Sequence, residues 1–175
     1  LTLKYYHINT PHGSPFTTIY ASKGCPYSCI FCTVRNTQVK KRSAESILNE
    51  LRYLKKQFNV KMVSFFDETF TIDRERVIAI CEALKREKLK IIWYCNTRVA
   101  LVDADLLKIM YAAGCRGLSY GIESGSQIIL NNAKKGTTVE QAEKAIKWGK
   151  FVGLKVYCSF IFGLPGENCL TVEET

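Results

Sequence analysis

The chain of 175 residues contains no apolar run that approaches the roughly 20 residues needed to span a lipid bilayer. Its N-terminus also lacks the charged segment followed by an apolar stretch that marks a secretory signal. These two absences argue against a membrane-spanning protein and against a secreted one. We therefore expect a soluble, cytoplasmic protein without a membrane partner.

Ligands for a structural zinc site are scarce as well. The chain has 2 histidines, and no second Cys-x-x-Cys pair follows the cysteine-rich segment from Gly24 to Thr33. Structural zinc takes four protein ligands that are commonly delivered as two pairs. The usual zinc-finger arrangements are therefore missing from this sequence.

The segment from Gly24 to Thr33 reads Gly-Cys-Pro-Tyr-Ser-Cys-Ile-Phe-Cys-Thr and brings Cys25, Cys29 and Cys32 close together. Thiolates at such spacing suit a soft metal or an iron-sulfur cluster, because one loop can aim several sulfurs at one centre. A cubane cluster normally takes four cysteines, so three would leave one iron without a protein ligand. The pattern favours a catalytic cluster, and the motif alone leaves zinc and chance open as alternatives.

The other five cysteines are scattered at irregular spacing, mostly through apolar periodic segments. These five are Cys81, Cys95, Cys115, Cys158 and Cys169. We expect all of them except Cys169 to be reduced and mostly buried, which fits a reducing compartment.

A hydrophobic content of 47% is enough for one domain with a sizeable core. Residues 1–16 have no apolar periodicity and predict a linker from a missing upstream region, whereas residues 17–175 form the core domain. The chain starts without Met, and Thr171-Val-Glu-Glu174 is typical of a capping box with no helix behind it. We expect an excerpt of a longer protein.

Strands and helices are expected to alternate along the core domain, which is typical of parallel βα units with right-handed crossovers. Periodicity alone leaves an open doubly wound sheet and a barrel as alternatives. The expected strands are 17–21, 60–66, 90–95, 115–122 and 154–162, a short helical piece covers 124–133, and Ser43, Asp73, Asp103 and Thr138 open the longer helices.

Unusual polar residues follow the carboxyl end of every expected strand. These ends lie on one face of either parallel architecture, and ligands bind there. In strand order, the residues are Cys25 to Cys32, Asp67 and Glu68, Asn96 and Arg98, Glu123 and Ser124, and Gly163-Leu-Pro-Gly-Glu167.

The pattern Cys25-x-x-x-Cys29-x-x-Cys32, with Phe31 before the last cysteine, resembles the cluster loop of the radical S-adenosylmethionine (radical SAM) enzymes. In that family SAM chelates the open iron, and reduction cleaves it to a 5′-deoxyadenosyl radical that abstracts hydrogen. The resemblance implies a [4Fe-4S] cluster and SAM as cofactors. It also implies an α/β fold, a parallel (βα) partial TIM-type barrel, here truncated after the fifth strand with its sixth βα unit missing.

The resemblance also implies residues that bind SAM. Phe31 would pack near the adenine, Glu123 would reach the ribose or the methionine end, and Lys135 would pair with the cofactor carboxylate. A solvated charge is the alternative for Lys135. The remaining candidates are Asp67, Glu68, Asn96 and Arg98, for which an acidic turn or loop polarity is the alternative, and Ser159 and Gly163 on the adenine side.

The motifs Cys-Pro-Tyr-Ser-Cys, Gly-Ile-Glu-Ser and Gly-Leu-Pro-Gly-Glu are most similar to the radical SAM branch that often carries an N-terminal cobalamin-binding domain. That branch includes radical methyltransferases and cyclases. The methylthiotransferase and coproporphyrinogen-oxidase branches share parts of these motifs. No Asp-x-His-x-x-Gly cobalamin signature is present, so a cobalamin-binding domain either lies upstream of Leu1 or is absent.

The resemblance implies a small-molecule substrate and a one-electron reductant of the flavodoxin or ferredoxin type. Two other functions stay open. A net charge of +9 and the run from Lys40 to Arg42 fit an RNA-modifying radical SAM enzyme with a tRNA partner. A non-catalytic zinc or iron-sulfur module would explain the cysteines but not the polar residues after all five strands.

Overall fold

The computed structural model of the chain describes residues 15–175, and a parallel sheet of order β1-β4-β5-β6-β7 forms its centre. Every neighbouring pair in this sheet is parallel, which confirms the predicted α/β class. The strands are β1 (Phe16–Ile19), β4 (Met62–Phe65), β5 (Ile92–Thr97), β6 (Cys115–Glu123) and β7 (Lys155–Phe160).

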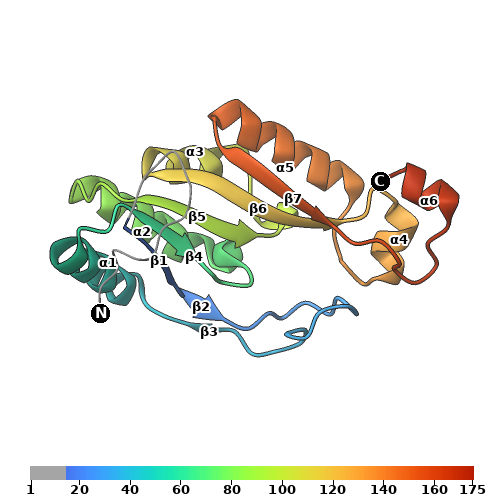
Figure 1. Cartoon of the computed structure of the whole chain (residues 1–175), viewed down its shortest axis with the longest axis horizontal. Helices are drawn as coiled ribbons and strands as arrows, with labels where there is room; N and C mark the ends of the chain where they lie inside the picture. Colours follow the sequence, from blue (N-terminus) through green and yellow to red (C-terminus); the bar gives the residue numbers. More distant parts are fainter. Residues whose placement is uncertain (1–14) are drawn as a thin grey trace.

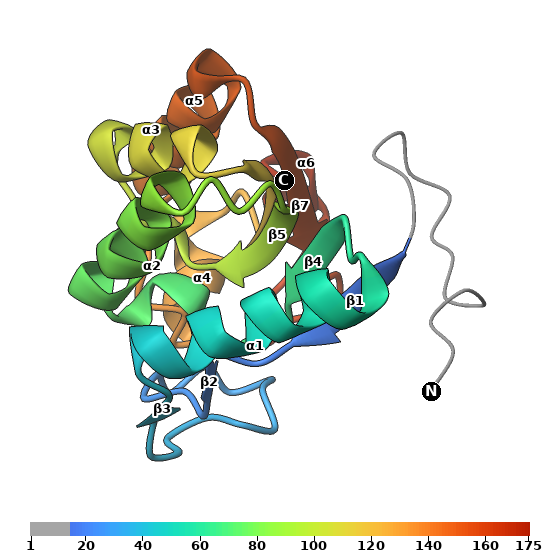
Figure 2. The same cartoon turned by 90° about the vertical axis from the view of Figure 1, so that its left-hand side faces the viewer.

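The sheet is curved, and its long helices form an arc along its outer side (Figure 2). This is the arrangement of part of a (βα) barrel, with each helix connecting two neighbouring parallel strands. The helices are α1 (Ala44–Phe58), α2 (Arg74–Arg86), α3 (Ala104–Ala112) and α5 (Val139–Val152) on the outer side, and α4 (Gln127–Asn132) and α6 (Cys169–Glu173) at one end of the molecule (Figure 1).

Four helices begin where local sequence signals predicted. The side chains of Ser43, Asp73 and Asp103 accept hydrogen bonds from the backbone N–H groups of Ser46, Arg76 and Leu106. Thr138 and Gln141 form a reciprocal capping box at the start of α5. These caps satisfy N–H groups that the first turn of a helix leaves without an internal partner.

The core lies between the sheet and the outer helices. Phe65, Phe70 and Trp93 pack against one another, with ring centroids 4.4 to 5.5 Å apart. All three are fully buried, as are Leu118 and Tyr120 on the neighbouring strand β6. Burial of such large side chains is the main favourable contribution to folding.

Two expectations about the chain's local structure were wrong, and one element was missed. Phe16, placed in the linker, pairs with Met62 in β1. A short antiparallel hairpin of β2 (Ser22–Lys23) and β3 (Lys40–Lys41) was not predicted. Thr171 does not open a helix: Asn168 caps α6, and Thr171 is the third residue of that helix and closes the capping box. Residues 1–14 of the predicted linker lie outside the described residues.

Cys81, Cys95 and Cys115 are buried and free, as predicted, and Cys158 is half-buried. Burial raises the pKa of the Cys81 thiol to about 12, which keeps it protonated and unreactive near neutral pH. None of the helices in residues 15–175 is both long enough and apolar enough to cross a bilayer.

Candidate functional site

The loop that carries Cys25, Cys29 and Cys32 connects the two strands of the β2–β3 hairpin and extends toward α4 (Figure 1). It starts with a sharp turn at Gly24, whose φ is +97°. A Cβ atom at Gly24 would lie 2.3 Å from the carbonyl oxygen of Gln38. The turn therefore requires glycine, and it directs the chain into the cysteine segment.

Hydrogen bonds within the loop fix its shape. The backbone N–H of Cys25 donates to the Thr37 hydroxyl over 2.9 Å, and the N–H of Thr37 donates back to the Cys25 carbonyl over 2.9 Å. Across the loop, the N–H of Ile30 donates to the carbonyl of Ala133 over 3.0 Å, at the end of α4. The loop is thus tied both to itself and to the segment after β6.

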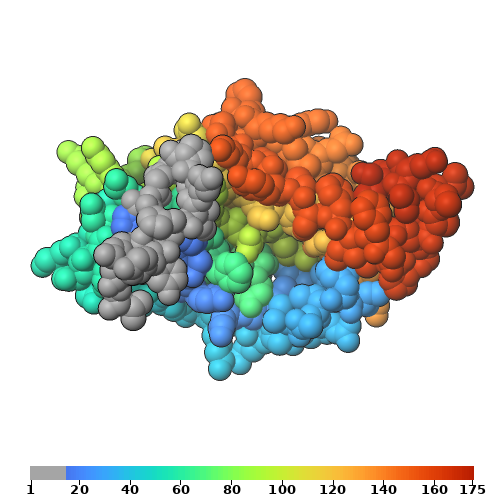
Figure 3. Space-filling view, viewed as in Figure 1, coloured from blue at the N-terminus to red at the C-terminus, as the bar shows by residue number. Residues whose placement is uncertain are grey.

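The far side of the loop packs against the C-terminal part of the chain. Ile30 and Phe31 contact a small apolar cluster of Ile129, Ala133 and Leu164, separate from the main core. Figure 3 shows the loop and the β7–α6 segment meeting on one face of the molecule. Phe31 and the segment around Gly163 therefore come to the same place, although they are far apart in the sequence.

Two of the three loop cysteines, Cys25 and Cys29, are buried, whereas Cys32 is partly exposed. Within residues 15–175, no three His, Cys, Asp or Glu side chains converge as they would around one metal ion. A zinc ion gathers all its ligands at one atom, whereas each cysteine of a cubane binds a different iron. Three thiols in one loop are a donor set that suits an iron-sulfur cluster, and binding of a cluster by these cysteines stays a prediction.

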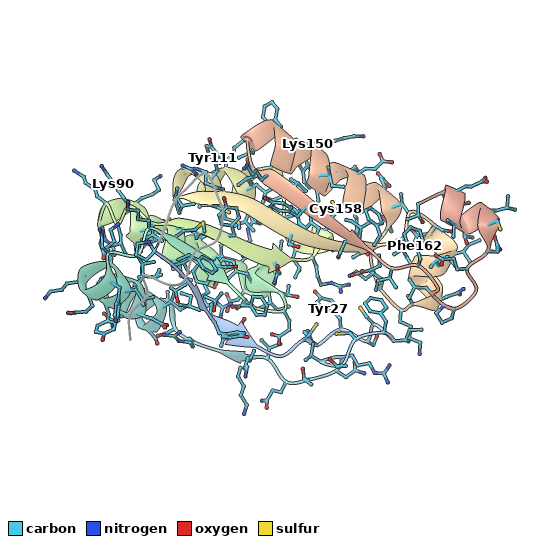
Figure 4. All side chains as sticks on the ribbon, viewed as in Figure 1. Tyr27, Lys90, Tyr111, Lys150, Cys158 and Phe162 are labelled. Carbon is cyan, nitrogen blue, oxygen red and sulfur yellow. The ribbon has the colours of Figure 1, made fainter. Side chains whose placement is uncertain are left out.

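Arg98, which follows β5, is the cation nearest the cysteines in the described contacts. Its Nη1 lies 3.5 Å from the Sγ atom of Cys29, and its guanidinium carbon lies 3.8 Å from the ring centroid of Tyr27. Its Nη2 donates to the carbonyl of Lys135. The side chain of Tyr27, a residue of the loop, lies on the side of the loop that faces the sheet in Figure 4. A buried cation at this place fits an anionic group held by the loop.

Glu123 and Lys135 form a buried ion pair beside the loop. The Lys135 Nζ lies 2.8 Å from the Glu123 Oε1, and both side chains are less than a tenth exposed. Glu123 ends β6 with a φ of +74°, which is unusual for a residue with a side chain. A Cβ atom on Gly121 would lie 2.2 Å from the Glu123 carboxylate, so glycine provides space for the pair. Lys135 also lies 5.8 Å from the Phe31 ring centroid.

The side chains of Asp67 and Glu68 accept hydrogen bonds from the residues that lead into the loop. The fully buried Asp67 carboxylate accepts hydrogen bonds from the Ala21 N–H over 2.8 Å and the Ser22 hydroxyl over 2.5 Å. Burial raises the pKa of Asp67, and these two hydrogen bonds oppose that shift. The Glu68 Oε2 accepts from the Gly24 N–H over 3.1 Å. Both carboxylates therefore have structural partners, and their predicted role in cofactor binding stays a prediction.

Arg76 belongs to the same region and was missed in the sequence. It lies in the first turn of α2, and its side chain is buried. Its Nη1 donates to the Ala21 carbonyl over 2.9 Å. Desolvation lowers its pKa, whereas the nearby Asp67 raises it. Only tertiary packing reveals this arginine, because no local signal distinguishes it from a surface residue.

The other predicted residues border the site more loosely. Asn96 donates to the Asp67 carbonyl over 3.4 Å, and Ser159 is the β7 partner of Gly121 in the sheet register. Gly163 has a φ of +87°, and a Cβ atom there would meet nothing within 4 Å. It lines an open groove of about 610 Å³ along α6. Cofactor binding by these three residues stays a prediction.

Two side chains of the basic run from Lys40 to Arg42 form ion pairs at the protein surface. Lys41 Nζ lies 2.6 Å from the Asp73 carboxylate, and Arg42 Nη1 lies 2.5 Å from the Glu50 carboxylate. Arg42 also donates to the Tyr20 carbonyl over 2.9 Å. Two of the three cations therefore serve the fold rather than a free basic surface.

A family model described as the radical SAM superfamily matches residues 19–175 of the chain. Over 167 residues the chain is 38% identical to an uncharacterized methyltransferase of Pyrococcus horikoshii, covering 93% of this chain and 36% of that protein. Over 160 residues it is 36% identical to the anaerobic magnesium-protoporphyrin IX monomethyl ester cyclase of Rubrivivax gelatinosus, covering 88% and 28%. The chain thus spans about a third of the length of these relatives.

A solved structure of the cobalamin-dependent S-adenosylmethionine radical enzyme OxsB, with aqua-cobalamin and S-adenosylmethionine bound, superposes with a TM-score of 0.80. The sequences are 27% identical, and the match covers 90% of this chain and 25% of that one. The partial barrel and the position of its helices are therefore shared with an enzyme of known structure.

Proposed function

The chain belongs to the radical SAM superfamily, and from this membership we propose that Cys25, Cys29 and Cys32 bind a [4Fe-4S] cluster whose fourth iron binds S-adenosylmethionine. When bound, these groups supply an electron and a sulfonium whose reductive cleavage gives a 5′-deoxyadenosyl radical for hydrogen abstraction. The observation that carries the proposal is the loop itself: three cysteines, fixed by backbone hydrogen bonds, lie beside a buried arginine.

The ion pair beside the loop suits the polar end of SAM. Lys135 would bind its carboxylate, and Glu123 would accept hydrogen bonds from its ammonium or ribose hydroxyls. Phe31 would pack against the adenine, because it lies in the apolar cluster with Leu164. Gly163 has open space where the adenine would lie, which supports the same placement.

The net reaction of the whole protein is proposed from its relatives. Methyl transfer is supported by the methyltransferase that is 38% identical to this chain over the 167 aligned residues, and cyclisation by the cyclase that is 36% identical over 160 residues. Both suggest a small-molecule substrate. Cobalamin is proposed as a further cofactor, held outside this sequence, because the OxsB structure contains it. The electron would come from a reductant of the flavodoxin or ferredoxin type.

RNA modification is the second candidate, supported by the net charge of +9. The engaged side chains of Lys41 and Arg42 weaken this candidate, because they remove two cations from the most basic run. Salt-dependent binding of tRNA by the purified protein would favour it.

Anaerobic reconstitution with iron and sulfide tests the main proposal. We expect about four irons and four sulfides per chain, and 5′-deoxyadenosine after reduction with SAM present. Cys25→Ala, Cys29→Ala and Cys32→Ala should each lose the cluster absorbance and the cleavage product. Cys95→Ala is the matched control, because Cys95 is a buried thiol outside the loop, and it should keep both. Retention of zinc alone by the parent would contradict the proposal.

A further inference from the structure

Arg98 differs from the other buried cations of the site in what it contacts. Lys135 faces the Glu123 carboxylate, and Arg76 lies near Asp67. Within residues 15–175, no carboxylate lies in salt-bridge distance of Arg98, whose side chain is buried, with 6% of the residue exposed. Its contacts are a sulfur, an aromatic face and a carbonyl.

A buried guanidinium without a carboxylate is unfavourable by itself, because water that would solvate the charge is excluded. The Nε of Arg98 also has no hydrogen-bond partner in the described part of the chain. An anionic group near Cys29 would compensate this charge. The structure therefore places a positive charge that has no neighbouring carboxylate beside the sulfur atom of Cys29, a predicted cluster ligand.

The contacts also fix the guanidinium in one orientation. Tyr27 stacks under it at 3.8 Å, Nη2 is held by the Lys135 carbonyl, and Nη1 points at Cys29 Sγ over 3.5 Å. Stacking combined with a planar fork of donors is specific to arginine, and a lysine ammonium cannot reproduce it. The hydrogen bond to sulfur is thus part of a rigid assembly.

We propose that Arg98 is a positioning residue that raises the reduction potential of the cluster through the sulfur of Cys29. The inference rests on the proposed function, because it needs the cluster to be present. Reduction by the external one-electron donor adds one negative charge to the cluster. A fixed cation beside a ligand sulfur stabilises this extra charge, and hydrogen bonds to cluster sulfurs act in the same direction.

The test is a redox titration of the reconstituted protein, followed by the paramagnetic resonance signal of the reduced cluster. In Arg98→Gln we expect the ratio of reduced to oxidised cluster to fall about tenfold at a given potential, a shift of about 59 mV to more negative values. Arg98→Lys keeps the charge and loses the fork, so its potential should lie between those of the parent and Arg98→Gln.

Arg116→Gln is the matched control. Arg116 also stacks on a tyrosine, Tyr111, at 4.4 Å and donates to backbone carbonyls, but it lies at the start of β6, away from the cysteine loop. Its removal should leave the cluster potential unchanged.

Iron and sulfide contents are measured in parallel, so that failure of the proposed function is recognised separately as a parent protein that assembles no cluster. Arg98→Gln with a full cluster and the parent's potential would overturn the inference. Folded Arg98→Gln and Arg98→Lys proteins that both fail to assemble a cluster would also reject it, because Arg98 would then serve assembly instead of potential.

Discussion

The helix-covered side of the sheet and its carboxyl end are both buried, yet they bury opposite kinds of side chain. Phe65, Phe70 and Trp93 fill the first region with rings that contact one another in tilted and edge-to-face arrangements. The second region buries ionisable groups, among them Arg98 and the Glu123–Lys135 pair. Apolar burial stabilises a fold in proportion to area, whereas buried charges are stable only when their partners remain.

This difference indicates which region is arranged for stability and which for binding. A buried pair such as Glu123–Lys135 could be replaced by apolar residues with little loss or even a gain of stability. The same pair needs a glycine at position 121, where a side chain would clash with it, and a positive φ at Glu123, which is an unfavourable backbone conformation for a residue with a side chain. Such departures from the best local choice are typical of functional sites.

Replacing Lys135 with methionine should give the largest loss of stability, because it leaves the Glu123 carboxylate buried without its cation. Removing one partner of a buried pair typically costs roughly 3–5 kcal/mol in the free energy of unfolding. Urea denaturation of the cluster-free protein measures this change.

The double variant Lys135→Met with Glu123→Gln is the control for this pair. It should recover most of the loss, because neither charge is then buried alone. If Lys135→Met lowered the free energy of unfolding by less than about 1 kcal/mol, the contrast between the two regions would be wrong for this pair.

Cys95→Ala addresses the apolar region and should have a smaller effect. Burial raises the pKa of the Cys95 thiol well above its usual range, so the side chain behaves as a small neutral core residue. Truncating it should lower the free energy of unfolding by about 1–2 kcal/mol, with the iron content unchanged. The half-buried Cys158 provides the comparison, since Cys158→Ala should cost less. Iron loss from folded Cys95→Ala protein would show that the thiol is a ligand.

The parts of the fold that could be predicted from the sequence depend on neighbouring residues. Ser43, Asp73 and Asp103 each cap a helix through an N–H group three residues ahead, so the signal and its partner lie together. The β2–β3 hairpin depends instead on pairing between Ser22 and Lys41, far apart in the chain, and strands of two residues have no periodicity to detect. At α6, Asn168 and Thr171 are both good capping residues, and their spacing within one box made either a plausible start.

For the site, the positions of polar residues after the expected strands predicted which residues would lie close together, but not which side chains would contact one another. The rule that carboxyl ends of parallel strands share one edge correctly brought the cysteine loop, Arg98 and Glu123 together. The contact of Arg98 with Cys29 and the partnership of Asp67 with Ser22 depend on side-chain packing between distant segments. No spacing in the sequence encodes these contacts.

The smallest effect is expected at the exposed ion pair of Lys41 and Asp73, whose charged atoms lie 2.6 Å apart. This distance is shorter than the 2.8 Å of the buried pair, but the Lys41 side chain is 48% exposed. Lys41 and, after it, the Arg76 N–H lower the pKa of Asp73 below its ordinary value of 3.8. Because the native pKa is the lower one, the pair stabilises the protein at pH values above the ordinary pKa, and this contribution is lost as the pH falls through the native pKa.

Lys41→Met should therefore lower the free energy of unfolding by about 0–1 kcal/mol at neutral pH. The difference from the parent should disappear below the native pKa of Asp73, where the carboxyl is protonated in both proteins. It should also shrink with added salt, because exposed charges are screened, whereas the effect of Lys135→Met should change little. Unfolding of both variants across pH and salt measures this. Equal salt dependence of the two methionine variants would mean that burial does not separate these pairs, since solvent would then reach Glu123 and Lys135 as readily as it reaches Lys41.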